Sequence, residues 1–246
     1  MKFSFIFTAL LIVLADAENA EENKDLMDAD LFEGDIVLEP VQRLAVDLGI
    51  EIRGSMGNRL WPNAIVPYTI APSLSSQPKA MQAIENAMNE WSSVSCIRFI
   101  RRTTEQSYIE FFKGKGCYSS LGRTGKKQQL SLAAGCWGKI TVAHEIAHAL
   151  GFAHEQSRPD RDEYVTINFE NIQAGKQHNF KKYSSSQINS LDTPYDYESV
   201  MHYGAKYFSK NNLPTIVPKQ TGVKIGQRKY LSGMDILQMN LLYKCR

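Results

Sequence analysis

The hydrophobic and polar positions of residues 78–93 repeat with the period of an α-helix. Met81, Ile84, Met88 and Trp91 follow one another at intervals of three and four residues. This spacing places their side chains on one face of a helix. The segment is therefore predicted to be an amphipathic helix that buries one stripe against the rest of the protein.

Three other segments have the composition of β-strands. Aromatic and β-branched residues gather in residues 61–68, 96–100 and 108–112, and a polar, turn-like stretch separates the last two. Such clusters bounded by polar residues are typical of strands.

Two further helices are predicted in the second half of the chain. One covers residues 139–150 and ends at Gly151, because a glycine commonly follows the last helical residue. The other begins near Ser232, which forms an S-x-x-D capping box with Asp235. The residues between these helices lack periodicity and are expected to form long ordered loops, so the chain is assigned to the α+β class.

The N-terminus has the pattern of a secretory signal. Lys2 precedes an apolar run over residues 3–14, and residues 15–17 form an A-x-A cleavage site. A membrane anchor needs about 20 apolar residues, so this run is too short for one. Residues 1–17 are therefore expected to be a signal peptide, and the mature protein to be secreted and extracellular without stable membrane association.

Charge divides the rest of the chain into two parts. Residues 18–53 carry eleven acidic and three basic side chains, a local charge of −8, whereas the remainder is basic. An acidic leader of this composition is not expected to fold alone, and it is either a pro-segment or a disordered tail. The basic side chains of the remainder are scattered, and no aromatic-basic motif accompanies them, so nucleic acid is not an expected partner.

Four cysteines are available for cross-linking: Cys96, Cys117, Cys136 and Cys245. An even number in an exported chain implies two disulfides, and the count alone leaves three pairings open. No two cysteines have C-x-x-C spacing, which argues against a zinc site made by cysteines.

The strongest chemical signal is the stretch HEIAHALGFAHE at residues 144–155. His144 and His148 lie four residues apart, so on a helix both imidazoles project from one face toward a single ion. Glu145 falls beside that ion, where it can act as a general base toward water. Gly151 can end the helix with a positive φ and let the chain return His154 to the same ion.

A purely structural interpretation competes with this one. The histidines could be core residues, or ligands of a closed structural zinc site, which takes four protein ligands and has no use for Glu145. Three of the five histidines lie within eleven residues, however, and Glu145 and Gly151 stand where a catalytic zinc site requires them. The pattern therefore favours metal-assisted hydrolysis.

The same residues resemble a known family. H-E-x-x-H-x-x-G-x-x-H followed by Met201 is the metzincin pattern, and Glu155, residues 156–162 and residues 199–204 resemble the astacin family within it. The resemblance extends from about residue 61 to residue 245. It implies a two-lobed catalytic domain with one Zn²⁺ in the cleft between the lobes. The N-terminal lobe would hold a twisted, mostly antiparallel-edged sheet plus helices, and the C-terminal lobe would be rich in loops.

The resemblance implies a zinc metalloendopeptidase that acts on proteins or peptides, with Glu145 as its general base. Met201 would form a hydrophobic base beneath the metal histidines. Tyr203 would be an additional zinc ligand that swings away to stabilise the oxyanion, although spacing alone favours an ordinary packed tyrosine. His202 and His178 are expected to be structural or solvated. The alternative is a catalytically inactive secreted protein-binding module that retains the fold, but the intact Glu145 and histidines argue against it.

The resemblance also implies a disulfide pairing, namely Cys96 with Cys245 and Cys117 with Cys136. Because the sequence stops one residue after Cys245, we expect a minimal catalytic unit, and we expect it to be a monomer.

Residues 32–35, with the sequence FEGD, resemble the aspartate switch of the same family. In a latent form Asp35 would ligate the zinc in place of the catalytic water, and Gly34 would let the backbone pass close to the metal. The chain is accordingly divided into a pro-segment at residues 18–53 and a catalytic domain at residues 54–246.

The activation site departs from the family pattern. Cleavage is expected after Arg53, with Arg59 as the alternative. In the family the new amino terminus approaches the glutamate after the third histidine, which is Glu155 here.

One residue is expected to control specificity. Arg228 lies in a segment that resembles the family's wall of the pocket for the residue just after the scissile bond. Its guanidinium fork suits a carboxylate, which predicts a preference for Asp, and less strongly Glu, at that position. The competing interpretation is a solvated surface arginine.

Overall fold

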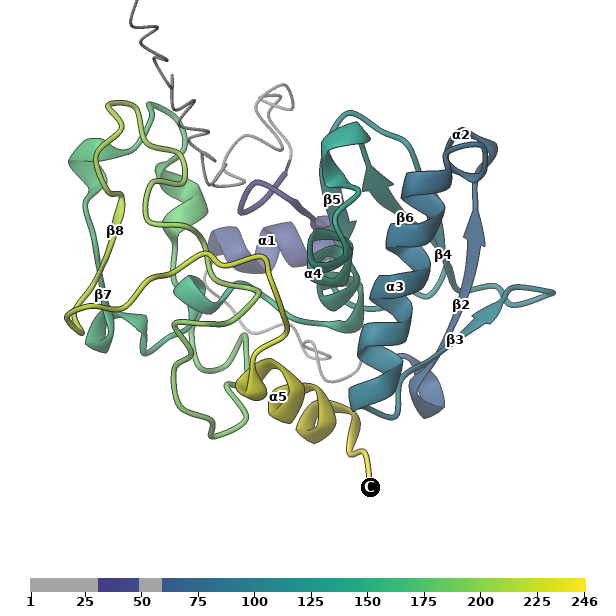
Figure 1. Cartoon of the computed structure of the whole chain (residues 1–246). Helices are drawn as coiled ribbons and strands as arrows, with labels where there is room; N and C mark the ends of the chain where they lie inside the picture. The colour runs from purple at the N-terminus through teal and green to yellow at the C-terminus, as the bar shows by residue number, and fades with distance from the viewer. Residues whose placement is uncertain (1–30, 49–58) are drawn as a thin grey trace, which may run out of the picture.

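A six-stranded sheet organises the N-terminal lobe in the computed structural model, which describes residues 31–48 and 59–246 (Figure 1). Its strands are β1 (Ile36–Val37), β2 (Ile65–Ile70), β3 (Arg98–Arg101), β4 (Tyr108–Phe112), β5 (Cys117–Ser120) and β6 (Lys127–Leu132). Their spatial order is β1-β5-β6-β4-β2-β3. The pair β5–β6 is antiparallel, and the other described pairs of this sheet are parallel.

The strands predicted near residues 61–68, 96–100 and 108–112 correspond to β2, β3 and β4. The antiparallel edge is provided by β5, while the rest of the sheet is more parallel than expected. Strands β5 and β6 had no sequence prediction. In β6, the sequence KQQLSL has few residues with high strand propensity, and exposed polar side chains alternate with buried ones over its first half.

Three helices complete the N-terminal lobe: α2 (Pro72–Ser75), α3 (Pro78–Val94) and α4 (Lys139–Leu150). The predicted bounds of α3 and α4 agree with these. Helix α3 packs against α4 and buries Ile84, Met88 and Trp91 of the predicted stripe, while Met81 is half-buried. Helix α4 is buried on all sides from Ile140 to Leu150, which is typical of a helix in the centre of a domain.

Two tryptophans fix helix α4 in place. The indole of Trp91 donates a hydrogen bond to the carbonyl of Ala143 at 2.9 Å, and that of Trp61 donates to Ala149 at 2.8 Å. Ala149 belongs to the last turn of the helix, whose carbonyls have no partner within it. The tryptophans therefore add hydrogen bonds to a helix already held by apolar packing.

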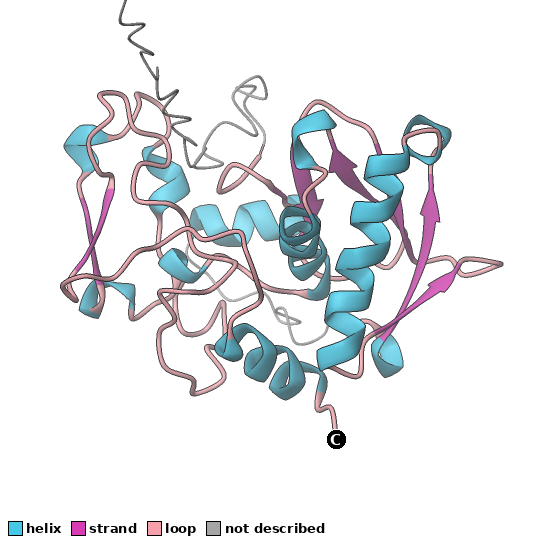
Figure 2. Ribbon diagram, viewed as in Figure 1, coloured by secondary structure: helices cyan, strands magenta, loops and turns pink. Residues whose placement is uncertain are grey.

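The C-terminal lobe is built mainly of loops, as predicted (Figure 2). Its only described sheet is the antiparallel pair β7 (Val165–Ile167) and β8 (Ile216–Pro218), and its helix α5 spans Gly233–Tyr243. Ser232 caps α5 in a reciprocal capping box with Asp235, as the sequence predicted.

Short 3-10 helices are found between residues 62 and 180 of the described chain. They occupy Pro62–Ala64, Ala134–Cys136, Glu155–Ser157, Arg161–Glu163, Phe169–Asn171 and Gln177–Phe180.

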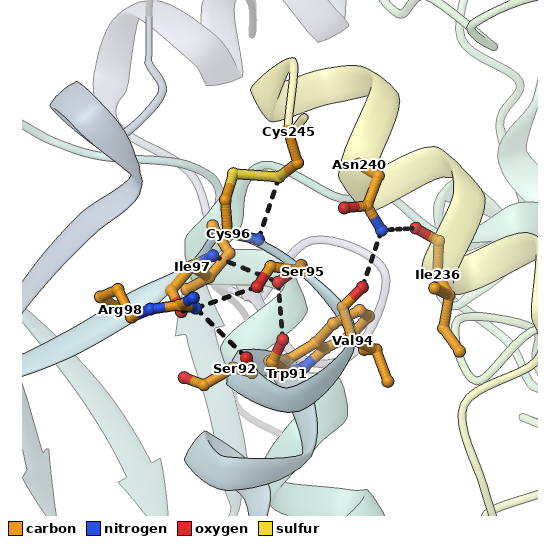
Figure 3. Close-up of a disulfide and its surroundings, with 10 residues drawn as sticks. All are labelled: Trp91, Ser92, Val94, Ser95, Cys96, Ile97, Arg98, Ile236, Asn240 and Cys245. Carbon is orange, nitrogen blue, oxygen red and sulfur yellow. Dashed lines mark hydrogen bonds between the residues drawn. A yellow bond between two sulfur atoms is a disulfide. The ribbon is translucent and has the colours of Figure 1, made fainter.

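Two disulfides join the expected cysteines. Cys96 is bonded to Cys245 and Cys117 to Cys136. The first connects the turn between α3 and β3 to the chain just after α5 (Figure 3), across 149 residues of chain. A cross-link over so long a loop removes much of the entropy of the unfolded chain.

The described part of the acidic leader lies against both lobes. Its strand β1 adds to the sheet beside β5, and its helix α1 (Pro40–Leu48) follows directly. Gln42 donates to the carbonyl of Leu121, and Gln187 donates to the carbonyl of Ala45. Residues 31–48 of the leader thus pack on the body of the protein. Within the described ranges, no helix has the length and apolar character needed to span a bilayer.

Candidate active site

Four buried side chains converge at the centre of the molecule. They are Asp35, His144, His148 and His154, and one potential ligand atom from each lies within 4.8 Å of all the others. The Oδ2 atom of Asp35 is 3.2 Å from Nε2 of His144 and 3.3 Å from Nε2 of His154, and its Oδ1 atom is 3.4 Å from Nε2 of His148. The structure thus brings the leader's aspartate to the three histidines that the sequence singled out.

This donor set fits a zinc ion. Among the described residues, the Nε2 atoms of His148 and His154 and the Oδ1 atom of Asp35 are buried without a hydrogen-bond partner. Buried polar atoms ordinarily have partners, and these three point into one cluster. Three imidazoles and one carboxylate are a ligand set typical of Zn²⁺.

The electrostatics of the cluster also suit a cation. Burial, reinforced by the charge of Arg228, lowers the pKa of His144 to about 3, so its imidazole is neutral, as a metal ligand must be. Burial opposes the charge of Asp35, but His154 and His148 hold the pKa of this carboxyl well below its usual value. Burial would likewise lower the pKa of His154, yet the Asp35 and Glu33 carboxylates raise it to about 9.

Helix α4 and the glycine after it place the three histidines. His144 and His148 project from successive turns, with ring centroids 4.7 Å apart. Gly151 adopts φ 111°, and its N–H donates to the carbonyls of Ala147 and His148. This left-handed end turns the chain back so that the ring of His154 lies 4.6 Å from that of His148.

The far side of each imidazole has its own partner. Nδ1 of His144 lies 2.9 Å from the carbonyl oxygen of Val200, and Nδ1 of His148 lies 2.7 Å from that of Phe152. Nδ1 of His154 lies 2.7 Å from Oε2 of Glu33, a carboxylate of the leader. Such contacts fix the tautomer and the orientation of the ring, so that Nε2 faces the cluster.

Glu145 and Tyr203 are both buried next to the cluster. Glu145 follows His144 on α4 and is 2% exposed. The ring of Tyr203 lies 4.6 Å from that of His154. Its hydroxyl donates to the carbonyl of Glu33, and burial together with the nearby carboxylates raises its pKa well above the usual value. In this form the leader therefore engages the tyrosine that the sequence proposed as a ligand.

The segment that carries Met201 is fixed by α5. Asp235 accepts hydrogen bonds from the hydroxyl of Ser199 at 2.7 Å and from the N–H of Val200 at 2.9 Å. Met201 itself is buried in the main hydrophobic core, and its carbonyl accepts from the N–H of Glu155. The residue after the third histidine is thereby joined to the turn that precedes Tyr203.

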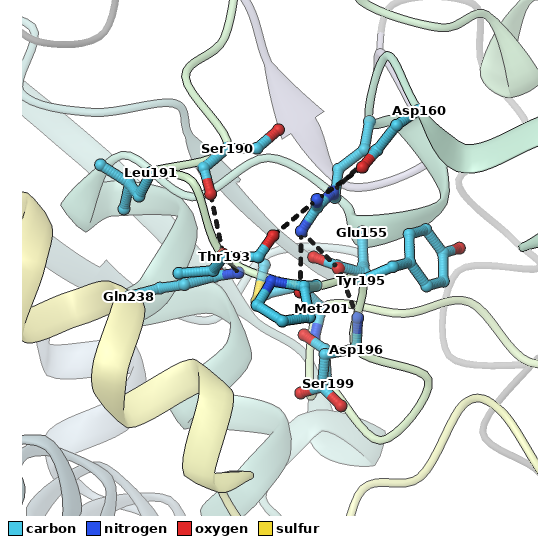
Figure 4. A network of polar contacts seen from close by, with 12 residues as sticks. Glu155, Asp160, Ser190, Leu191, Thr193, Tyr195, Asp196, Ser199, Met201 and Gln238 are labelled. Atoms are coloured by element: carbon cyan, nitrogen blue, oxygen red, sulfur yellow. Dashed lines mark hydrogen bonds and ion pairs between the residues drawn. The ribbon is translucent and has the colours of Figure 1, made fainter. Parts of the chain in front are cut away.

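Glu155 belongs to a polar network that crosses the C-terminal lobe (Figure 4). Its Oε1 accepts from Arg158 at 3.2 Å and from the N–H of Asp196 at 2.8 Å. Burial raises the pKa of Glu155 to about 8, and these two donors oppose the shift. Arg158 also donates to the carbonyls of Thr193 and Pro194.

Arg228 is half-buried rather than fully solvated. Its guanidinium donates to the carbonyls of His202 and Gln227. His202 is completely buried, with Nε2 2.7 Å from the hydroxyl of Tyr195, and is therefore structural, whereas His178 is exposed. These positions agree with the prediction that His202 and His178 are structural or solvated.

Two residues at the site were given no role by the sequence analysis, although both lie in motifs that it singled out. Gln156 is buried and its Oε1 accepts from the N–H of Tyr203 at 3.0 Å. Glu33 is fully buried against His154. The sequence signal for Glu33 is its place in the FEGD motif of residues 32–35, and the signal for Gln156 is its place in the stretch after Glu155 that resembles the family.

Comparisons with known proteins agree with this geometry. The family model of astacin, a family of peptidases, matches residues 54–244. Zinc metalloproteinase nas-15 of Caenorhabditis elegans is 42% identical over 229 residues, which cover 88% of this chain and 40% of that protein. Meprin A subunit beta of Homo sapiens is 42% identical over 257 aligned positions, covering 98% of this chain and 35% of that protein. The chain thus spans less than half the length of these two relatives.

Among solved structures, high choriolytic enzyme 1, a hatching enzyme zinc-protease from Oryzias latipes, is 41% identical with a TM-score of 0.73. The match covers 80% of this chain and 100% of that one. The two-lobed arrangement seen here is therefore the fold of that enzyme.

Proposed function

Because this chain belongs to the astacin family of peptidases, we propose that it is a secreted zinc endopeptidase made as a latent precursor. The observation that carries the proposal is the cluster of His144, His148, His154 and Asp35, with Glu145 buried on the same helix directly after His144. A peptidase needs metal ligands and a proton acceptor in one place, and this cluster offers both.

His144, His148 and His154 would hold the zinc in the active form, and the zinc would polarise the scissile carbonyl and lower the pKa of water at the site. Glu145 takes a proton from the attacking water and delivers it to the leaving amine. After the leader departs, the hydroxyl of Tyr203 no longer donates to Glu33 and becomes available to stabilise the oxyanion. Met201 supports the histidines from the core.

Latency follows from the same geometry. Asp35 occupies the space between the three Nε2 atoms, so water and substrate have no access while it remains there. We assign residues 18–53 to the pro-segment and residues 54–246 to the catalytic domain, a division supported by the start of the family match at residue 54. The proposed signal peptide, residues 1–17, lies outside the described residues.

Cleavage after Arg53 is favoured over cleavage after Arg59. The carbonyl of Arg59 accepts a hydrogen bond from the N–H of Arg123 at 2.6 Å. A bond held in this way is a poor protease target, because proteases need an extended, unpaired segment. Arg53 itself lies outside the described residues. The new amino terminus would then approach Glu155, as in the family.

Specificity is assigned to Arg228. The influence of its charge on His144 supports a position close to the catalytic centre, and its backbone contacts limit its freedom. A substrate side chain with a carboxylate could pair with its guanidinium, which favours Asp, and less strongly Glu, just after the scissile bond.

The test uses the full chain activated on immobilised trypsin, which is then removed. The new amino terminus is sequenced, and the product is incubated with a peptide library whose fragments are identified by mass spectrometry. We expect internal cleavage that a zinc chelator abolishes and added zinc restores. Cleavage that persists in a preparation shown to lack metal would refute the proposal.

A further inference from the structure

The three metal histidines differ in what holds them from behind. The Nδ1 atoms of His144 and His148 face backbone carbonyls of the body. The Nδ1 atom of His154 faces the Glu33 carboxylate at 2.7 Å. One ligand of the zinc centre is therefore oriented by a side chain that leaves when the pro-segment is removed.

Glu33 is built into this position. Its side chain is 0% exposed, and its Oε2 contacts Nδ1 of His154. Among the described residues, its Oε1 has no hydrogen-bond partner. Glu33 has φ 50° and Gly34 has φ 78°, and a side chain on Gly34 would come within 2.8 Å of the ring of Phe208. The tight turn thus aims both Glu33 and Asp35 into the site, one on each side of the imidazole of His154.

Burying a carboxylate without compensation is costly. The charge of Glu33 interacts with the buried guanidinium of Arg161, and a metal centre would add a second positive partner on the far side of His154. Asp35 and Glu33 together carry two negative charges, which balance the two positive charges of Zn²⁺. A carboxylate behind a metal-bound histidine also makes the imidazole a stronger ligand, and removing such a partner typically weakens metal binding about 10- to 100-fold.

We propose that the pro-segment is also a metal-retention element: Glu33 positions His154 from the side opposite the metal, so the uncleaved precursor binds zinc more tightly than the cleaved enzyme. This inference rests on the proposed function, because it takes the cluster to be a zinc centre that the pro-segment covers. Glu33 is a positioning residue in this scheme. It would help the chain to keep its metal until activation, beyond the blocking role of Asp35.

The test measures zinc affinity in the full-length precursor by competition with a chromogenic chelator. Wild type is compared with Glu33→Gln, which removes the charge but keeps the size, and with Glu33→Ala, which removes the acceptor. Asp47→Asn is the matched control, since it removes one negative charge from an exposed position of the same leader. We expect Glu33→Gln to bind zinc about 10- to 100-fold more weakly, Glu33→Ala at least as weakly, and Asp47→Asn like wild type.

Cleavage supplies a second control. Once the leader is removed, every variant yields the same catalytic chain, so all cleaved products should bind zinc equally and more weakly than the wild-type precursor. A purely structural role for Glu33 would instead lower the melting temperature of the metal-free precursor and leave zinc affinity unchanged. That result, or a cleaved enzyme that binds zinc as tightly as the precursor, would overturn the inference.

Peptidase activity of the cleaved products is measured separately. If they lack activity while the zinc affinities follow the expected order, the proposed function fails and the inference stands. If they are active while Glu33→Gln and Glu33→Ala bind zinc like wild type, the inference alone fails.

Discussion

The N-terminal and C-terminal lobes supply the same catalytic centre but hold their residues by different means. Helix α4 of the N-terminal lobe delivers His144, Glu145 and His148 from little more than one turn, and apolar packing surrounds it. The C-terminal lobe delivers Tyr203 and Arg228 from loops without regular backbone pairing around them.

Buried polar side chains replace secondary structure in the C-terminal lobe. Arg158 bonds to Glu155 and Asp160 in its own stretch and joins that stretch to the carbonyls at residues 193 and 194. Asp235 holds the turn before Met201 in the same way. The lesson is that replacing a polar side chain with alanine should cost less stability on α4 than in the loops, while its chemical effect on α4 can be far greater.

The largest expected effect tests the helical side of this comparison. Glu145→Ala should lower kcat/KM of the activated enzyme by about 10²- to 10⁴-fold, because the group that transfers the proton is lost. Fold and zinc content should remain, since alanine suits a helix. Steady-state kinetics, circular dichroism and metal analysis would check this, with Glu85→Ala on the exposed face of α3 as control. A folded, zinc-loaded variant with nearly full activity would refute the assigned role.

The loop side is tested by Arg158→Ala. The arginine side chain is only 6% exposed, and its loss removes a donor from Glu155 and from the carbonyls of Thr193 and Pro194. We expect the free energy of unfolding to fall by roughly 3–5 kcal/mol, as measured by chemical denaturation. Arg98→Ala is the control, because Arg98 is exposed and its loss should cost about 1 kcal/mol or less. If both substitutions lowered the free energy of unfolding equally, the proposed difference between the lobes would be wrong.

Specificity gives a smaller effect in the same loops. Arg228→Ala should reduce the preference for Asp just after the scissile bond about 10- to 100-fold, because a charge-assisted pair is worth ~1.5–3 kcal/mol. Arg228→Lys should weaken the preference less, since it keeps the charge but loses the planar fork. Cleavage profiles of the three enzymes on one peptide library decide the matter. Identical profiles would contradict a role in specificity, and Arg228 would then have only its structural contacts to His202 and Gln227.

The smallest expected effect concerns the leader that lies against both lobes. Asp35→Ala should give an uncleaved precursor with peptidase activity on the order of tenfold above background, since each ~1.4 kcal/mol of lost ligand binding raises the exposed fraction tenfold. The assay needs a precursor shown by gel to be intact, with Asp47→Ala as control. If the Asp35 variant is as silent as wild type, the leader blocks the cleft by bulk rather than through the aspartate.

Local sequence determined those parts of the protein that depend on neighbouring residues. The spacing of His144 and His148, the glycine at residue 151 and the capping box at Ser232 specify helix limits and side-chain directions within a few turns. The apolar stripe of α3 is of the same kind. For this reason the metal histidines and the helices α3, α4 and α5 could be predicted directly from the sequence.

Tertiary structure decided the contacts between distant segments. Asp35 meets His144 across 109 residues, Glu33 meets His154 across 121, and Tyr203 meets Glu33 across 170. The sequence pointed to Asp35 and its FEGD motif only through a family resemblance and gave Glu33 no role, because no local period or propensity records which side chain will lie behind an imidazole. Strands β5 and β6 escaped prediction for the same reason, since their pairing is set by the neighbours they meet in the folded sheet.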